Sequence, residues 1–397
     1  MIIKNFQLKN WNQFENVDIE WHPRLTVLTG KNGAGKSTIL RILSKLIGSE
    51  SYELATPSKP TGTNRIQVTL QRNPSQQKQS IKSQIGTITL ANGSLLDLQV
   101  PDQSSSPLYS ITFSPALLYP ARGFLIPSYI PLDSYQKVES VSIRTHIKGS
   151  LKTGMMGRRQ IKESLVRLAV IGEGNDSAAQ TKDAMQFFLG FIDVLKILLP
   201  PTLGFQTIIV RDGEVVLKTA SGEFLLDAAS AGLGSIIDLA WHIYMVGAGE
   251  TEPFLVLIDE AENHLHASIQ RGLLPKLLQA FPHAQFIIST HSPLMVNSVR
   301  DAYVYALSYN ENNLVESHKL ESLHCAANAT QIFRDVLGVT VTMPSWVEES
   351  LAQVLENFKN SEMTLESYIC LKRELSILGL SEYLPQALQY VQEGESP

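Results

Sequence analysis

Residues 24–37 read RLTVLTGKNGAGKS, an apolar segment that runs directly into a glycine-rich turn. The segment 24–29 has the composition of a buried strand, and the residues after the turn, STILRILSKLIG, are apolar at helical spacing. The turn itself fits the pattern G-x-x-x-x-G-K-[ST], whose glycines let successive backbone N–H groups point at a polyphosphate. The sequence therefore predicts a strand, a phosphate-binding loop and a helix, in that order.

This loop supplies most of the residues expected to bind a phosphate. Lys36 would neutralise the β- and γ-phosphates of a nucleotide, and the Ser37 hydroxyl would bind Mg²⁺. The N-terminus of the following helix adds N–H donors and a favourable dipole. The expected nucleotide-binding residues here are Asn32, Gly33, Ala34, Gly35, Lys36, Ser37 and Thr38. A plain glycine-rich turn is the alternative interpretation.

Residues 254–260, FLVLIDE, form an apolar strand that ends in two carboxylates. Asp259 is expected to complete the Mg²⁺ site, as the acidic partner of a phosphate loop does. Glu260, one residue further, stands where a base could polarise an attacking water. The alternative is that the two acidic residues only cap the next helix.

Two further segments are weaker signals. FIISTH at 286–291 is a second apolar strand, and His291 at its end could donate a hydrogen bond to the γ-phosphate; a purely structural histidine is the alternative. Ser230 and Gly232, in ASAGLGS, open the predicted helix 230–247 and make an anion-receptive N-terminus. A simple helix cap is the alternative there.

Taken in order, these motifs resemble those of the ABC-type ATPases of the SMC/RecF kind. The segments NFQLKNWNQFENVDIEW, IDEAENHLHAS and FIISTHSPLMVNS look most like compact bacterial AAA-type ATP-binding proteins related to the OLD family. The resemblance covers residues 1–48 and 225–345. It implies an α/β fold: a P-loop ABC-type ATPase head with an antiparallel β-layer, a helical lid insertion and a C-terminal helical tail.

The resemblance also implies a mechanism and partners. ATP and Mg²⁺ would be held by Lys36, Ser37 and Asp259 of one subunit, and Ser230 and Gly232 of a second subunit would cap the γ-phosphate. The chain would thus form a homodimer or a higher homo-oligomer, and hydrolysis through Glu260 would release it. OLD proteins often carry a Toprim nuclease with an Asp-x-Asp pattern; the sequence has no such pattern, so we expect no nuclease domain.

The segments between the motifs suggest four parts. Alternating residues at 65–72, 87–100 and 108–113 predict antiparallel strands, with a hairpin turn at Asn92-Gly93. Helical patterns follow at 160–199 and a β-segment at 207–219. The expected parts are an N-terminal ATPase lobe at 1–120, a connector, helical lid and short β-segment at 121–225, a signature, Walker B and His-switch lobe at 226–344, and a helical tail at 345–397.

Composition limits the function classes. The chain has 33 Lys plus Arg and 38 Asp plus Glu, a net charge of −5, which excludes an overall basic coat for nucleic acid. Its two cysteines cannot form a disulfide framework or a four-thiolate zinc site, as expected of a cytoplasmic protein. The most apolar helical stretch, at 187–199, is too short to span a bilayer, so we expect no membrane insertion.

One basic segment stands out in this mildly acidic chain. Between 144 and 167 the acidic residue Glu163 is opposed by seven cations: Arg144, Lys148, Lys152, Arg158, Arg159, Lys162 and Arg167. The segment could track the phosphates of DNA or RNA, chiefly through Arg144, Lys148, Lys152, Arg158 and Arg159. A solvated helical face and a docking site for an acidic partner are the alternatives.

The leading hypothesis is a cytoplasmic, Mg²⁺-dependent ATPase that dimerises through ATP and controls an effector protein or nucleic acid, in anti-phage defence or DNA maintenance. The alternative is a slowly hydrolysing, nucleotide-gated scaffold that holds or inhibits a separate nuclease or toxin. A transporter subunit is disfavoured, since the chain has Ala-Ser-Ala-Gly where transporters have Leu-Ser-Gly-Gly-Gln. Phe14 is a candidate to stack on adenine, with core packing as the alternative, and Gln136 is a guess for the Mg²⁺-sensing glutamine.

Overall fold

The computed structural model of the 397-residue chain describes residues 2–54, 57–58, 67–69, 82–101, 103–104, 108–116, 120–128, 156–173, 178–249, 251–263, 265–320, 353–355, 358, 365–377, 381, 384 and 387–388. The chain divides into two compact units, Met1–Ala326 and Ala327–Pro397. Each unit is described by itself. The expected phosphate site lies entirely in the first.

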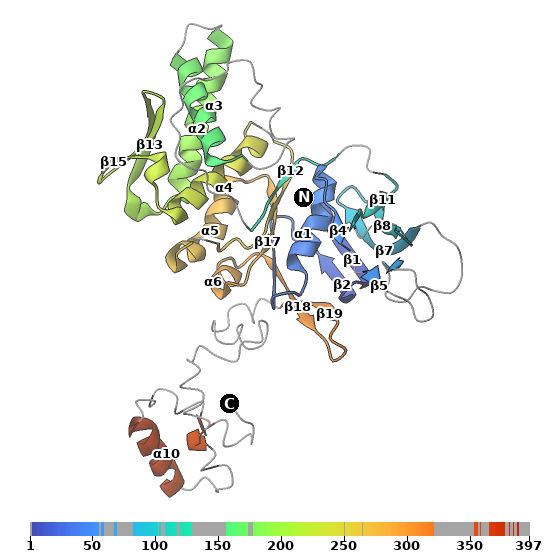
Figure 1. Ribbon diagram of the computed structural model, residues 1–397. Coiled ribbons are helices and arrows are strands. Elements are labelled where there is room, and N and C mark those ends of the chain that lie inside the picture. The colour runs from blue at the N-terminus through green and yellow to red at the C-terminus, as the bar shows by residue number, and fades with distance from the viewer. Residues whose placement is uncertain are drawn as a thin grey trace. The chain divides into compact units, whose positions relative to one another are not determined.

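An eleven-stranded sheet organises the first unit (Figure 1). From edge to edge its strands are β11 (Thr112–Ser114), β8 (Leu95–Pro101), β7 (Lys82–Leu90), β1 (Ile3–Trp11), β2 (Phe14–Glu20), β19 (Val315–Leu320), β18 (Tyr303–Tyr309), β3 (Leu25–Gly30), β17 (Ala284–Ser289), β16 (Phe254–Ile258) and β12 (Gly123–Ile126). Strands β18, β3, β17, β16 and β12 run parallel, whereas β11, β8, β7, β1 and β2 alternate in direction. The predicted α/β fold is confirmed, and the antiparallel strands continue the same sheet.

Apolar residues cover both faces of the parallel strands. Helix α1 (Lys36–Ser44) shares one core with the alternate strand residues Leu255, Leu257 and Ile287. Helix α4 (Ala231–Gly247) packs on β12 and β16. Strands buried on both faces are apolar at every position, which explains the uninterrupted FLVLI of β16.

The strand expected at 24–29, the helix after it, and the strands expected at 254–258 and 286–289 are confirmed by β3, α1, β16 and β17. The hairpin expected at Asn92-Gly93 joins β7 to β8. Sequence reasoning did not predict β1, β2, β18 or β19. Of these, β19 and β2 lie near opposite ends of the unit's sequence but pair with each other, with Val315 opposite Phe14.

The predicted lid is a helical hairpin beside a small sheet. Helices α2 (Arg158–Glu173) and α3 (Ala178–Leu198) pack on one another, and α2 and α3 both contact β13 (Phe205–Arg211). Strands β14 (Glu214–Thr219) and β15 (Gly222–Leu225) complete the three-stranded sheet. The helix break expected near 172–175 lies between α2 and α3, and the turn expected at Asp212-Gly213 joins β13 to β14.

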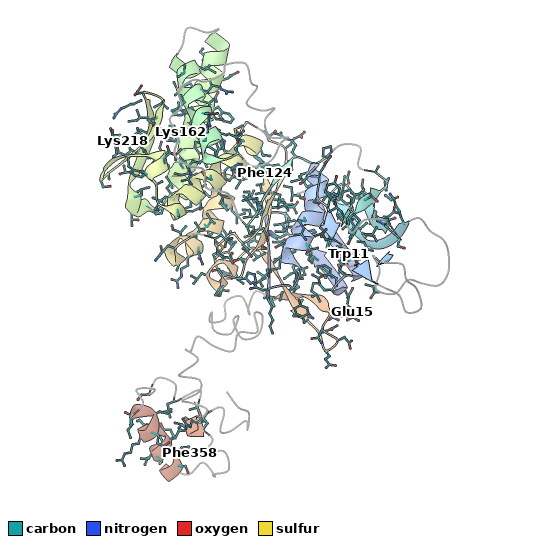
Figure 2. The ribbon with its side chains drawn as sticks, viewed as in Figure 1. Trp11, Glu15, Phe124, Lys162, Lys218 and Phe358 are labelled. Carbon is teal, nitrogen blue, oxygen red and sulfur yellow. The ribbon has the colours of Figure 1, made fainter. Side chains whose placement is uncertain are left out.

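Smaller elements connect these layers. They are η1 (Lys45–Ile47), β4 (Glu53–Leu54), β5 (Pro57–Ser58), β6 (Gln67–Thr69), β9 (Gln103–Ser104), β10 (Leu108–Tyr109), η3 (Pro201–Leu203), η4 (Leu226–Ala228), α5 (Ala267–Ala280) and α6 (Pro293–Val296). In the second unit, α10 (Leu365–Ile377) contributes to a small core that contains Phe358 and Leu371 (Figure 2). No helix within the described residues is long and apolar enough to cross a membrane.

Gly86 tests the packing of the antiparallel strands. A Cβ at this position would lie 2.0 Å from the carbonyl oxygen of Gln7 on β1, so Gly86→Ala forces the two backbones apart. We expect it to lower the free energy of unfolding by about 1–3 kcal/mol, which thermal unfolding would detect. The matched control is Gly93→Ala, because a Cβ there meets nothing within 4 Å and Gly93 has a positive φ of 86°. If Gly86→Ala unfolds with the native free energy, the close approach of β1 does not constrain this position and the prediction is wrong.

Candidate nucleotide-binding site

The loop between β3 and α1 turns through Gly30, Gly33 and Gly35, whose φ angles are 136°, 81° and 90°. A Cβ at Gly35 would lie 2.3 Å from the ring of Phe14, so the loop needs glycine there for space as well as for conformation. Gly35 is also the N-cap of α1, and no side chain caps that end of the helix. The first N–H groups of α1 therefore point into the loop, where an anion would bind them.

Lys36 begins α1 and is only 5% exposed. Its Nζ donates to the carbonyl oxygens of Gly30 (3.0 Å) and Lys31 (3.1 Å). Burial lowers the pKa of Lys36 to about 8, although nearby carboxylates, Asp259 foremost, oppose the shift. A polyphosphate in the loop would offer this ammonium charged acceptors in place of two neutral carbonyls.

The loop meets the acidic strand through one hydroxyl. Ser37 Oγ donates to Oδ1 of Asp259 at 3.0 Å, although 222 residues separate the two in sequence. The hydroxyl of Ser289, at the end of β17, donates to the same Oδ1 at 2.5 Å. Strand β17 lies beside β3 and β16 lies beside β17, and all three run parallel, so the carboxyl ends of β16 and β17 reach the loop at one edge of the sheet. A hydroxyl and a carboxylate oxygen side by side are ligands that Mg²⁺ prefers.

Glu260 is fixed in an unusual conformation, with a φ of 51°. Its backbone N–H donates to Ser289 Oγ at 2.8 Å. The side-chain amide of Asn263 donates to Oε2 of Glu260 at 3.0 Å and to the carbonyl of Ser128 at 2.7 Å. The carboxylate is thereby held beside Asp259 by the turn that follows β16.

His291 lies on the loop that follows β17. Its backbone N–H donates to Oε1 of Glu262 at 2.6 Å. Burial lowers the pKa of His291 and the charge of Lys36 lowers it further, while Glu262 and the other nearby carboxylates oppose the shift. A neutral imidazole at pH 7 can donate a hydrogen bond from one ring nitrogen and accept one at the other.

The segment that contains Ser230 and Gly232 begins α4. Ser230 is the exposed N-cap of α4, and its side chain makes no capping hydrogen bond. Ala231, in the first turn of α4, lines a pocket together with Glu260 and Asn263. The structure thus brings the phosphate loop, Asp259 and Glu260 together, and leaves Ser230 on the surface of the described part of the unit.

Phe14 packs in the core. It is fully buried beneath Gly35 and stacks on Trp11, with ring centroids 6.0 Å apart. The suggestion that Phe14 stacks on adenine is therefore wrong, and the core-packing alternative is confirmed. Gln136 lies outside the described residues.

Sequence reasoning missed Ser289, Glu262 and Asn263 as members of the cluster. Each stands within a segment already noted, at the end of β17 or directly after β16. Their position past the carboxyl ends of parallel strands was the available signal, because such residues meet at one edge of the sheet.

The basic segment is only partly a surface. Arg158 binds Asp238 through Nη2 to Oδ2 at 2.7 Å, and the two side chains are 13% and 7% exposed. The expectation that Arg158 contacts nucleic acid is therefore wrong. Lys162 is buried in ion pairs, whereas Arg159 is exposed and pairs with Glu163 on its own helix. The other residues proposed to contact nucleic acid, Arg144, Lys148 and Lys152, lie outside the described residues.

Two family descriptions match the chain. "AAA domain" matches residues 5–153, and "AAA domain, putative AbiEii toxin, Type IV TA system" matches residues 172–297. The first match includes the phosphate loop, and the second includes both acidic residues and His291.

Curated relatives share parts of the sequence. "Retron Ec83 probable ATPase" of Escherichia coli is 28% identical over 44% of this chain and 28% of its own length. "Septu protein PtuA" of Bacillus mycoides is 25% identical over 78% of this chain and 41% of its own length. "OLD nuclease" of Thermus scotoductus is 24% identical over 75% of this chain and 60% of its own length. The chain thus spans between 28% and 60% of the length of these relatives.

Proposed function

We propose that this chain, a member of the SMC/RecF/OLD-like group of ABC- and AAA-type ATPases, is a Mg²⁺-dependent ATPase whose ATP-driven dimerisation and hydrolysis switch a separate effector in anti-phage defence. One observation carries the proposal: the contact of Ser37 Oγ with Asp259 Oδ1 at 3.0 Å. That contact joins the phosphate loop to the acidic strand, and it brings Lys36 and Glu260, the sequence neighbours of Ser37 and Asp259, to the same edge of the sheet.

The loop would hold the nucleotide. The N–H groups of residues 32–38 would bind the phosphate oxygens, and Lys36 would leave the carbonyls of Gly30 and Lys31 for the β- and γ-phosphates. These contacts would leave the γ-phosphate near the carboxyl ends of β16 and β17.

Ser37 and Asp259 fit a magnesium ion, because their adjacent oxygens are the hydroxyl and carboxylate ligands that this ion takes. Bound there, Mg²⁺ would neutralise charge on the phosphate oxygens. The chain's own contribution is to fix these two oxygens: Ser289 donates to Asp259 and Ser37 is set at the first turn of α1.

Glu260 would then accept the proton of the attacking water. Its carboxylate is held from one side by the amide of Asn263, and its backbone by the hydroxyl of Ser289. His291, neutral through burial, would donate to the γ-phosphate and lose that contact after hydrolysis. Its loop is held in place by Glu262.

The closing contact would come from a second copy of the chain. Ser230 is an exposed N-cap of α4, and its hydroxyl makes no capping hydrogen bond. Such a helix N-terminus can receive the γ-phosphate of a partner's nucleotide. ATP bound between two copies would then hold them together, and hydrolysis would release them.

The retron and Septu relatives support a role in cytoplasmic anti-phage defence, in which a separate effector protein responds to the nucleotide state. A nucleic acid could reach the complex through Arg159 and through Arg144, Lys148 and Lys152. Co-purification from the native operon would identify the effector.

The test is the oligomeric state of the Glu260→Gln variant, which should retain ATP because its base is lost. With ATP and Mg²⁺ its mass in light scattering should double, and EDTA or ADP should return it to the starting mass. Lys36→Ala in the same background should stay at the starting mass. A mass that ignores ATP and Mg²⁺ would contradict ATP-driven dimerisation.

A further inference from the structure

Helix α2 of the lid contacts the chain both before and after the signature segment, by which we mean residues 230–234. After the segment, Arg158 binds Asp238 of α4 through two hydrogen bonds, 2.7 Å from Nη2 and 3.4 Å from Nε. Before the segment, Lys162 binds Asp227 of η4 at 2.7 Å. Arg158 and Lys162 are one helical turn apart on α2, so a single helix face makes both contacts.

The Arg158 guanidinium also lies directly on the signature segment. A Cβ at Gly234 would come within 2.2 Å of Nη2 of Arg158, so only glycine lets the guanidinium sit this close to α4. The N–H of Gly234 donates to the carbonyl of Ser230 at 2.8 Å, in the first turn of α4. Arg158 therefore packs against the turn that carries Ser230.

Two more contacts tie the start of α2 to the same place. The N–H of Met156 donates to Nε2 of His242 at 2.9 Å, and Nδ1 of His242 donates to the carbonyl of Asp238 at 2.6 Å. Lys162, which Figure 2 labels on α2, is 1% exposed. It binds Glu214 of the small lid sheet at 2.5 Å. Helix α2 is thus fixed both to the lid sheet and to α4.

We propose that Arg158 is a positioning residue, which holds the signature segment in the geometry that meets the nucleotide of a second copy and couples that segment to the lid. This inference rests on the proposed ATP-driven dimerisation. An exposed segment that is already held in its binding conformation binds a phosphate more tightly, because it loses less conformational entropy on binding.

The ion pair between Arg158 and Asp238 has the features expected of a positioning contact. Both side chains are almost removed from water, and the guanidinium matches the carboxylate with two hydrogen bonds, which fixes orientation as well as distance. A lysine could keep the charge but not the second bond. If α2 moved, for example when a partner binds the lid, the ion pair between Arg158 and Asp238 would move the signature segment with it.

The experiment separates association from nucleotide binding, in the Glu260→Gln background. Arg158→Ala should raise the protein concentration needed for ATP-driven association at least about tenfold, with Arg158→Lys between the two. Binding of a fluorescent ATP analogue to the dilute, unassociated chain should stay within about twofold, since Arg158 does not touch the phosphate loop. The control is Arg211→Ala, which removes an exposed two-bond pair with Glu223 on the lid sheet.

The outcomes are distinct. Unchanged association of Arg158→Ala overturns the inference, and so does a parallel loss of ATP binding, because the defect would then be general. If Arg158→Ala does not fold, Asp238→Asn takes its place, and it should weaken association in the same way while ATP binding is retained. If the Glu260→Gln parent itself does not associate with ATP, the proposed function fails and the inference falls with it.

Discussion

A Glu260→Gln variant should bind ATP as tightly as the native chain and hydrolyse it about 10²–10⁴-fold more slowly, as loss of a general base predicts. Glutamine keeps the volume and the acceptor for the Asn263 amide, which donates to Oε2 of Glu260 at 3.0 Å. It cannot take a proton from water. The measurement is phosphate release at saturating ATP and Mg²⁺, with equilibrium ATP binding as the control for folding.

Asn263→Ala gives a graded companion to this result. It leaves the carboxylate but removes the amide that joins it to the carbonyl of Ser128, so kcat should fall about tenfold with KM unchanged. Near-normal hydrolysis by Glu260→Gln would remove Glu260 from the role. Glu262 would then be the candidate base, because its Oε2 is buried and has no hydrogen-bond partner among the described residues.

The same assay separates the two functional hypotheses. A native chain that already hydrolyses ATP as slowly as Glu260→Gln would favour the nucleotide-gated scaffold. A native chain that turns over steadily, and loses that activity in the variant, would favour the switching ATPase.

The central strands and the phosphate loop could be predicted from the sequence because their signals are local. A strand buried on both faces is apolar throughout, and the glycine spacing of the loop needs no distant partner to be recognised. Asp259 and His291 were predicted for the same reason, as polar residues that follow such strands directly. The expected place of Lys36 and Ser37 at the start of α1 also follows from the loop alone.

What the sequence did not predict depends on pairing between distant residues. Strand β19 lies beside β2, with Val315 opposite Phe14. The sequence of neither segment indicates that the two pair. The basic segment was misread for a related reason. Arg158 is neutralised by Asp238, 80 residues away, and Lys162 by Asp227, 65 residues away. Counting the charged residues in a short stretch of sequence omits the acidic residues that are distant in sequence and pair with that stretch in the fold.

Lys36→Ala should weaken the binding of ATP by about 10²–10³-fold, because it removes the one charge that reaches the β- and γ-phosphates from within the loop. Lys36 is buried and its Nζ donates to the neutral carbonyls of Gly30 and Lys31, so little has to be broken for it to turn to the phosphates. Calorimetry or a fluorescent ATP analogue would measure the loss.

Lys31→Ala is the matched control for that experiment. It lies in the same loop and removes the same charge, but its side chain is exposed and the carbonyl that Lys36 contacts is retained. ATP affinity should change less than about threefold in this variant, since an exposed lysine near a polyanion acts only through a screened field. Equal losses in the two variants would mean that the loop attracts ATP by its overall charge. A loss confined to Lys36→Ala would mean that the buried ammonium binds the phosphates directly. The proposed ATP-dependent contact between two copies requires such binding.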